Sequence, residues 1–112
     1  MKIEGDGYAI EHAEGTTSFS GSLRLNGTAE YQPIADFLDE SLEAGGDAVQ
    51  WDLSRLEFLN SSGINMLYKF VIGLRKRGNV TMKVRGSSEI AWQAKSLANM
   101  KKFLPGLELE IA

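Results

Sequence analysis

Segments with a strand-type hydrophobic period alternate with amphipathic helical segments along this chain. Apolar residues recur at every second position in 19–25, 80–84 and 107–111, the period of a strand with one buried face. Three other stretches carry apolar residues at helical spacing. The alternation predicts a β-β-α-β-α-β-α-β order, and such an order implies a mixed or largely parallel sheet flanked by helices.

The expected boundaries follow from turn and capping residues. Strands are predicted at 8–12, 19–25, 48–53, 80–84 and 107–111. The first helix should have Pro33 in its first turn, where a missing N–H costs nothing, and should end at Gly45–Gly46. The second should close on Arg75–Arg77, and the third should open at Ser87 with Ile90, Ala94 and Leu97 facing the core. Trp51 and the apolar residues Leu56, Phe58 and Leu59 are predicted to lie against the core.

Length and composition indicate one globular domain spanning residues 1–112. Apolar residues make up 43% and charged residues 24% of the chain, which is ordinary for a folded domain. No apolar run is long enough to span a bilayer, and the start lacks the pattern of an export signal, so a cytoplasmic protein is expected. An isoelectric point near 5.1 argues against nucleic-acid binding. The absence of cysteine removes disulfides and thiolate ligands.

The net charge of −3 conceals an uneven distribution along the chain. Residues 1–60 hold 12 acids and 3 bases, whereas residues 61–112 hold 3 acids and 9 bases. The two halves therefore carry −9 and +6. If the halves also separate in space, the molecule has an acidic side and a basic side.

The segment from Asp52 to Leu67, DLSRLEFLNSSGINML, is the most informative part of the chain. A strand ends, a short apolar connection follows, and Asn60–Ser61–Ser62–Gly63 stands where the second helix should begin. Asn and Ser are favoured helix N-caps because their side-chain oxygens accept hydrogen bonds from free backbone N–H groups. Taken alone, the cluster indicates only a capped helix start.

In its wider setting the segment resembles the STAS domain of anti-sigma-factor antagonists. The resemblance includes SLRLNG before the first helix, FLNSSGINML at the second helix, and Trp92–Gln93 with Lys95–Ser96–Leu97 near the third. These motifs are similar to those of stand-alone STAS regulators of cyanobacteria and other bacteria. The resemblance implies a STAS-like α/β fold, with a mixed sheet of four to five strands flanked by three to four helices.

The resemblance also implies a function in partner switching. In the family, a kinase-like ATPase phosphorylates the first serine after an acidic position, a phosphatase removes the phosphate, and only the unphosphorylated form makes the productive complex. That serine is Ser61 here. Asn60 stands where Asp is usual, so a kinase that recognises that carboxylate would not recognise this chain. The expected partner-binding residues are Asn60, Ser61, Ser62, Gly63, Ile64, Met66 and Trp92, with Met66 exposed beside Ser61.

No catalytic residue, metal site or cofactor is expected. His12 is the only histidine, so no Ser-His-Asp arrangement or histidine-rich metal site is possible. The chain is therefore predicted to be a regulatory binding module and not an enzyme. Two alternatives remain open: a non-phosphorylated scaffold, such as a subunit of a lipid-transport complex, and a small-ligand sensor. The second is weakened because the chain has no Gly-rich phosphate loop.

Overall fold

The computed structural model describes all 112 residues and contains six strands and three helices. The strands are β1 (Lys2–Gly5), β2 (Tyr8–Ala13), β3 (Thr16–Leu23), β4 (Ala48–Leu59), β5 (Thr81–Gly86) and β6 (Glu108–Ile111). The helices are α1 (Gly27–Gly45), α2 (Ser61–Arg77) and α3 (Gln93–Phe103). The predicted α/β class is confirmed, and β1 makes the sheet one strand larger than the predicted range.

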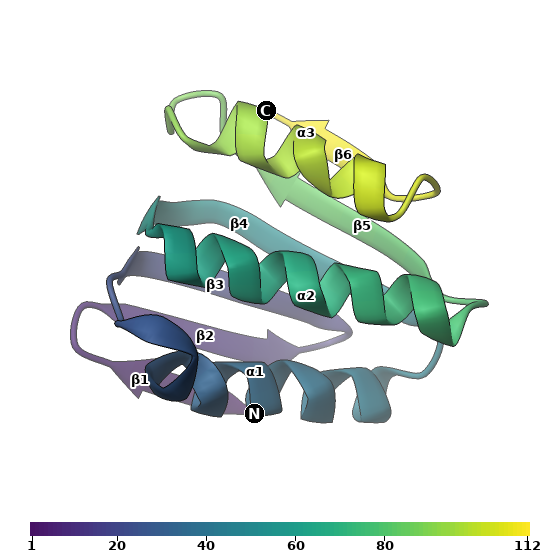
Figure 1. Ribbon diagram of the computed structural model, residues 1–112, viewed down its shortest axis with the longest axis horizontal. Helices are drawn as coiled ribbons and strands as arrows, with labels where there is room; N and C mark the ends of the chain where they lie inside the picture. Colours follow the sequence, from purple (N-terminus) through teal and green to yellow (C-terminus); the bar gives the residue numbers. More distant parts are fainter.

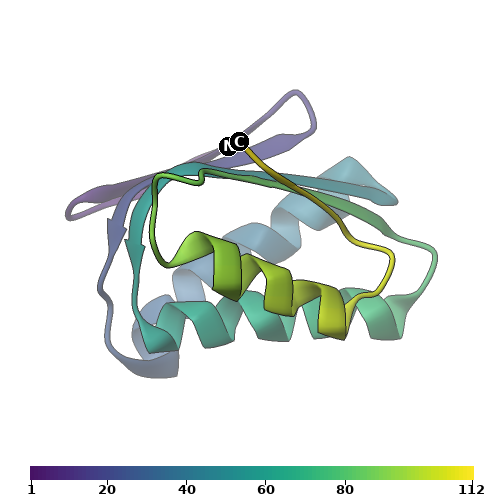
Figure 2. The same cartoon turned by 90° about the horizontal axis from the view of Figure 1, so that it is seen from above.

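All six strands form one mixed sheet in which the spatial order equals the chain order, from β1 to β6. The first three strands pair antiparallel, and β3 to β6 pair parallel. The three helices cover one face of the sheet, with α1 over the β1 side, α2 in the middle and α3 over the β6 side (Figures 1 and 2). No helix is both long and apolar enough to cross a membrane.

The core lies between the helices and the covered face of the sheet. Trp51 is 1% exposed, as the sequence predicted, and its ring lies 5.5 Å from Phe19 and 5.1 Å from Phe70 of α2. The opposite face of the sheet is polar, since the cross-strand row runs through Ser18, Asp52, Arg85 and Glu110. The period of two along each strand produces these two faces.

Two predicted helix starts were wrong. Helix α1 begins at Gly27, so Pro33 lies in its interior, where it cannot donate a backbone hydrogen bond to the carbonyl of the exposed Ala29. Helix α3 begins at Gln93, because the residues from Ser87 form turns held by hydrogen bonds from Ile90 N to Ser87 O and from Gln93 N to Ile90 O. Ala94, predicted to face the core, is therefore exposed.

Candidate functional site

The turn between β4 and α2 is held by the side chain of Asn60. Its Oδ1 accepts hydrogen bonds from Gly63 N at 3.0 Å and from the Tyr31 hydroxyl at 2.6 Å. Its Nδ2 donates to Leu25 O at 2.7 Å. The predicted N-cap is confirmed, and the same amide also ties α2 to α1 and to the segment that follows β3. Asn60 is half-buried, and its side-chain hydrogen bonds are made within the protein.

Gly63 allows the close approach of α1, β4 and α2. A Cβ at this position would meet the Leu59 side chain and would lie 2.7 Å from the Tyr31 hydroxyl. Gly63 is buried and presents no surface to a partner. Its contribution is the space that lets Tyr31 reach Asn60.

Ser61 is the first residue of α2, and its side chain is exposed. The first backbone N–H groups of a helix lack helical partners. Here Gly63 N is capped by Asn60 Oδ1 and Ile64 N donates to Asn60 O, so the free N–H groups of the first turn belong to Ser61 and Ser62. Helix α2 has no acidic residue in its first turn, and its last turn carries Arg75, Lys76 and Arg77. The positive end of the helix dipole at Ser61 is therefore not neutralised by the helix itself.

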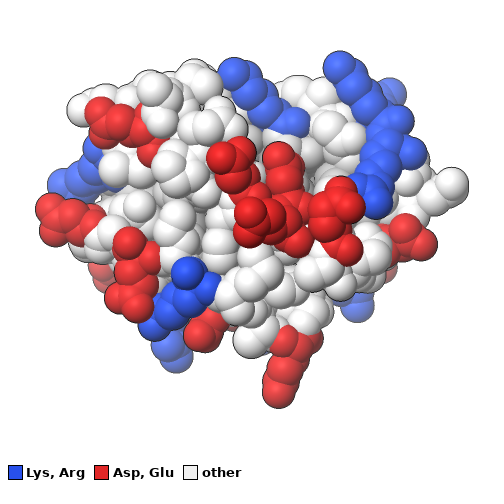
Figure 3. Space-filling model, turned by 90° about the horizontal axis from the view of Figure 1, so that it is seen from below, with Lys and Arg blue, Asp and Glu red and all other residues white.

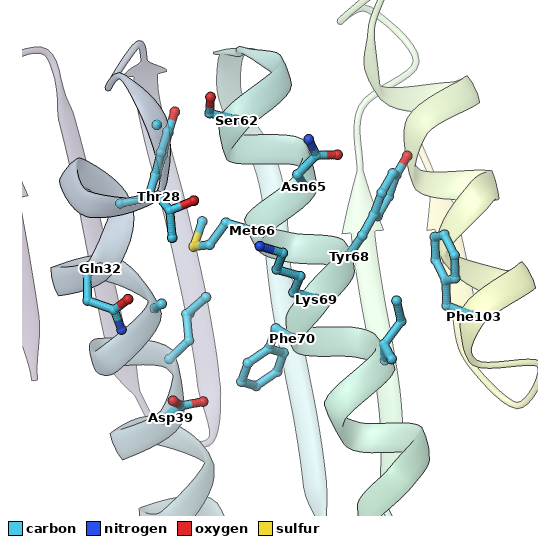
Figure 4. A pocket seen from close by; sticks show the side chains of 15 residues that line it. Thr28, Gln32, Asp39, Ser62, Asn65, Met66, Tyr68, Lys69, Phe70 and Phe103 are labelled. Atoms are coloured by element: carbon cyan, nitrogen blue, oxygen red, sulfur yellow. The ribbon is translucent and has the colours of Figure 1, made fainter.

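The other predicted site residues of α2 fall on two different surfaces. Ser62 is half-buried and faces α1, and Ile64 is half-buried beside the core. Met66 was expected to be exposed, and this was wrong: it is 8% exposed, because it packs between α1 and α2 (Figure 4). Met66 thus belongs to the floor of a groove and not to the surface around Ser61.

Trp92 and Gln93 bind the far half of β4. Strand β5 pairs with β4 only from Ala48 to Asp52, so the later β4 carbonyls need other donors. Gln93 is fully buried, and its Nε2 donates to Leu53 O at 2.6 Å and Leu56 O at 3.0 Å. The half-buried Trp92 donates its indole N–H to Glu57 O at 3.1 Å. The Trp92–Gln93 motif therefore replaces a strand neighbour and supports the end of β4 that leads to Ser61.

Phe58, predicted from the sequence to lie against the core, is a surface residue. It is 40% exposed, two residues before Asn60, and the Arg24 guanidinium carbon lies 4.6 Å from its ring centroid. Two register shifts between β3 and β4 rotate this part of β4, so Leu56 and Leu59 face inwards and Phe58 faces outwards. The signal in the sequence was the spacing of three between Leu56 and Leu59, which does not match a regular strand.

The charge asymmetry of the chain is also an asymmetry in space. Helix α1 contains five acidic residues and no basic one, α2 contains four basic residues and no acidic one, and α3 contains three lysines and no acidic one. Figure 3 views the molecule from the side of α1 and shows acidic side chains gathered there. The exposed acids on this face of α1 are Asp36, Asp39, Glu40 and Glu43.

No group of three or more His, Cys, Asp or Glu side chains is arranged to hold a metal ion. His12 is half-buried, and its Nδ1 lies 2.9 Å from the Thr17 hydroxyl oxygen. His12 of β2 pairs with Thr17 of β3 in the sheet, so this contact is part of the strand pairing.

No family model and no curated protein matches the chain. Solved structures do. SiaC of Pseudomonas aeruginosa matches 100% of this chain and 96% of its own length, with 18% identity and a TM-score of 0.70. A chain in the complex of the diguanylate cyclase SiaD with its activator SiaC, from the same organism, matches with 17% identity and a TM-score of 0.71, covering 100% of this chain and 99% of that one.

An anti-sigma factor antagonist from Mycobacterium paratuberculosis has the same architecture. It matches 90% of this chain and 83% of its own, with 19% identity and a TM-score of 0.59. At these identities the likeness is one of fold. The chain has a STAS-like fold, as the motif resemblance predicted.

Proposed function

We propose that the chain is a regulatory protein-binding module that works by partner switching in the bacterial cytoplasm. The unphosphorylated form binds a kinase-like ATPase through the surface at the start of α2. That partner phosphorylates Ser61, the added charge weakens the complex, and a phosphatase restores the binding form. The chain is a ligand and a substrate, and it catalyses no reaction itself.

The observation that carries this proposal is the exposed Ser61 hydroxyl on a turn that Asn60 holds rigid. A rigid turn presents the hydroxyl in one geometry to a kinase. The free N–H groups of Ser61 and Ser62, with the positive end of the helix dipole, suit a phosphate at this position. The shared fold with an anti-sigma factor antagonist and with SiaC, an activator that forms a complex with SiaD, supports a binding role.

Phosphorylation can act here without a large change in the fold. A phosphate adds a charge of about −1.5 to −2, which disfavours an interface built around a neutral hydroxyl through desolvation and like-charge repulsion. Phe58, exposed beside the turn, offers such an interface an apolar contact next to the modified residue. The switch is thus a local change of charge near one exposed aromatic ring.

Intact-mass analysis after incubation with ATP and a candidate kinase-like ATPase from the same organism tests the modification. Ser61→Ala removes the hydroxyl that would accept the phosphate, and alanine is compatible with the start of a helix. Ser62→Ala is the matched control. We expect one added phosphate on the wild type and on Ser62→Ala, and none on Ser61→Ala. Equal phosphate on wild type and Ser61→Ala would show that Ser61 is not the switch.

A binding assay with the same ATPase tests the effect of charge. Ser61→Asp should bind it more weakly than the wild type, and Ser62→Ala should bind it as the wild type does. Unchanged binding by Ser61→Asp would contradict release by charge. If the wild type takes up no phosphate but stays in a persistent complex, the chain is a non-phosphorylated scaffold, which is the second candidate.

A further inference from the structure

A pocket of about 550 Å³ extends across α2, from α1 on one side to Phe103 of α3 on the other. Its part between α1 and α2 is a groove that begins beside Ser62. Figure 4 shows Thr28, Gln32 and Asp39 on its α1 side and Ser62, Met66 and Phe70 on its α2 side. The lining of α1 extends from Gly27 to Asp39, which at 1.5 Å per residue is roughly 18 Å, or about three helical turns. The groove is therefore elongated along the two helices.

The floor of the groove is apolar. Leu38 and Met66 are buried beneath it, Ala35 is half-buried, and the half-buried ring of Phe70 packs on Trp51. No buried side-chain nitrogen or oxygen in the molecule lacks a hydrogen-bond partner. The floor therefore offers apolar contact, and apolar side chains would gain by covering it.

The walls of the groove select the kind of backbone that fits. Both walls are α-helices, whose N–H and C=O groups are bonded within each helix. An extended peptide would leave its own backbone groups without partners against such walls. A helix satisfies its backbone internally and needs to present only side chains.

The two rims carry opposite charges. On the α1 side the one charged residue of the lining is Asp39, which lies near the acids Asp36 and Glu43, and on the α2 side it is Lys69. Burial raises the pKa of the Asp39 carboxyl, and the negative charges of Asp36 and Glu43 raise it further. A cation placed beside Asp39 would relieve this crowding of negative charge.

We propose that the groove docks one amphipathic helix of a partner protein, whose apolar residues cover the floor and whose Lys or Arg residues face Asp39 and the α1 rim. This inference rests on the proposed function, because it names the segment by which the partner is held next to Ser61. The groove starts at Ser62, so a helix bound in it would extend the contact from the modified residue along α1 and α2.

Two labelled synthetic peptides test the proposal on the full, unmodified chain by fluorescence polarisation. Both are amphipathic helices of roughly four turns with the same Leu/Ala stripe, one with Lys and the other with Glu at the polar positions. We expect the Lys peptide to bind and the Glu peptide to bind at least about tenfold more weakly. Equal binding of the two peptides would overturn the proposal.

Two matched variants of α1 place the binding site. Ala35→Trp fills the groove without changing any charge, whereas Ala44→Trp adds the same side chain at an exposed position outside it. Ala35→Trp should weaken binding of the Lys peptide by about tenfold or more, and Ala44→Trp should leave it unchanged. Equal effects of the two variants would mean that the peptide binds the acidic surface and not the groove.

A charge variant keeps the test decisive if Ala35→Trp fails to fold. Asp39→Lys lies on the exposed rim, and it should weaken the Lys peptide and strengthen the Glu peptide. No change with either peptide would overturn the proposed orientation. Because these assays use no kinase, their failure leaves phosphorylation of Ser61 standing, and a failed mass assay leaves peptide docking standing.

Discussion

Asn60 connects three segments of the chain through one amide. Its oxygen accepts from α1 and α2, and its nitrogen donates to the carbonyl of Leu25. A carboxylate could accept both hydrogen bonds but could not make the donation. The presence of Asn and not Asp at this position therefore has a structural consequence: this turn is tied to the segment after β3 by a bond that Asp would lose.

We expect Asn60→Asp to lower the free energy of unfolding by roughly 1–3 kcal/mol near neutral pH, because the Leu25 carbonyl loses its donor and faces a carboxylate. Urea denaturation measures this loss. Asn65→Asp, the same change at an exposed position of α2, is the control and should shift stability by less than about 0.5 kcal/mol. Equal stability of Asn60→Asp and wild type would contradict this role of the amide.

The hydrogen bond from Tyr31 predicts a dependence on high pH. Burial raises the pKa of the Tyr31 hydroxyl above its ordinary 10.0, with a smaller opposing effect of a hydrogen bond at the Leu25 backbone. Above about pH 10.0 the unfolded chain loses this proton while the folded chain keeps it, so the free energy of unfolding falls as pH rises. Tyr31→Phe lacks this proton. The wild type should exceed Tyr31→Phe by about 1 kcal/mol near neutral pH, and urea titrations should show the gap narrowing above pH 10. A constant gap would show that the pKa of the Tyr31 hydroxyl is the same in the folded and unfolded chains.

At the scale of elements, β4 is the part of the sheet that most affects the site. It extends past β5, it shifts register twice against β3, and its end is held by side chains that precede or begin α3. The register shifts expose Phe58, and the bonds from Trp92 and Gln93 keep the unpaired β4 carbonyls satisfied. The position of Ser61 therefore depends on α3 as well as on its own turn.

Gln93→Ala should be among the most destabilising single changes in this protein. It removes the donors to Leu53 O and Leu56 O in a fully buried place, and it also removes the acceptor of Ser87 N. We expect a loss of at least about 2 kcal/mol in the free energy of unfolding. Gln50→Ala, on the exposed face of β4, is the control and should cost less than about 0.5 kcal/mol. Similar losses for the two variants, measured by chemical denaturation, would be inconsistent with this role of Gln93.

At the scale of the whole molecule, the charge asymmetry follows from the sheet order. Because the strands lie side by side in chain order, the first half of the chain forms one side of the molecule and the second half forms the other. The acidic half and the basic half are therefore separated in space, with α1 beside α2 and a single ion pair between these helices, Arg77 to Glu43 at 3.5 Å. A partner would meet an acidic and a basic surface on either side of the groove.

The crowding of acids on α1 has a cost in stability that one substitution can relieve. Burial, and then the negative charges of Asp36 and Glu43, raise the pKa of Asp39 above 3.8. The penalty on its charged form is therefore present at neutral pH and disappears as pH falls through the folded pKa to below 3.8. Asp39→Asn removes the charge at position 39, and with it the repulsion from Asp36 and Glu43, three and four residues away. This should stabilise the fold by roughly 0.5 kcal/mol near pH 7. The advantage should vanish in acid.

Thermal unfolding at several pH values measures this effect. The expected shift in melting temperature near neutral pH is about 2 °C. Asp47→Asn, outside α1, is the matched control and should change little. A lower melting temperature for Asp39→Asn at neutral pH would mean that the carboxylate is held by favourable contacts, and would weaken the case for an unsatisfied acidic rim.

Several features of this protein could be predicted from local patterns in the sequence alone. The order of strands and helices after β1, the burial of Trp51 and the start of α2 after Asn60 all depend on local hydrophobic period and capping chemistry, which a few neighbouring residues set. The motif around Ser61 likewise predicted where the candidate site lies. These features need no knowledge of which segments meet in the fold.

Only the tertiary structure decided which side chains of the motif are surface and which are interior. Met66 is covered because α1 packs against α2, and Phe58 is exposed because β4 shifts register against β3. Whether the acidic and basic halves separate in space was settled by the sheet order. Each of these depends on contacts between residues far apart in the chain, and the free energy of those contacts is not encoded in any local pattern.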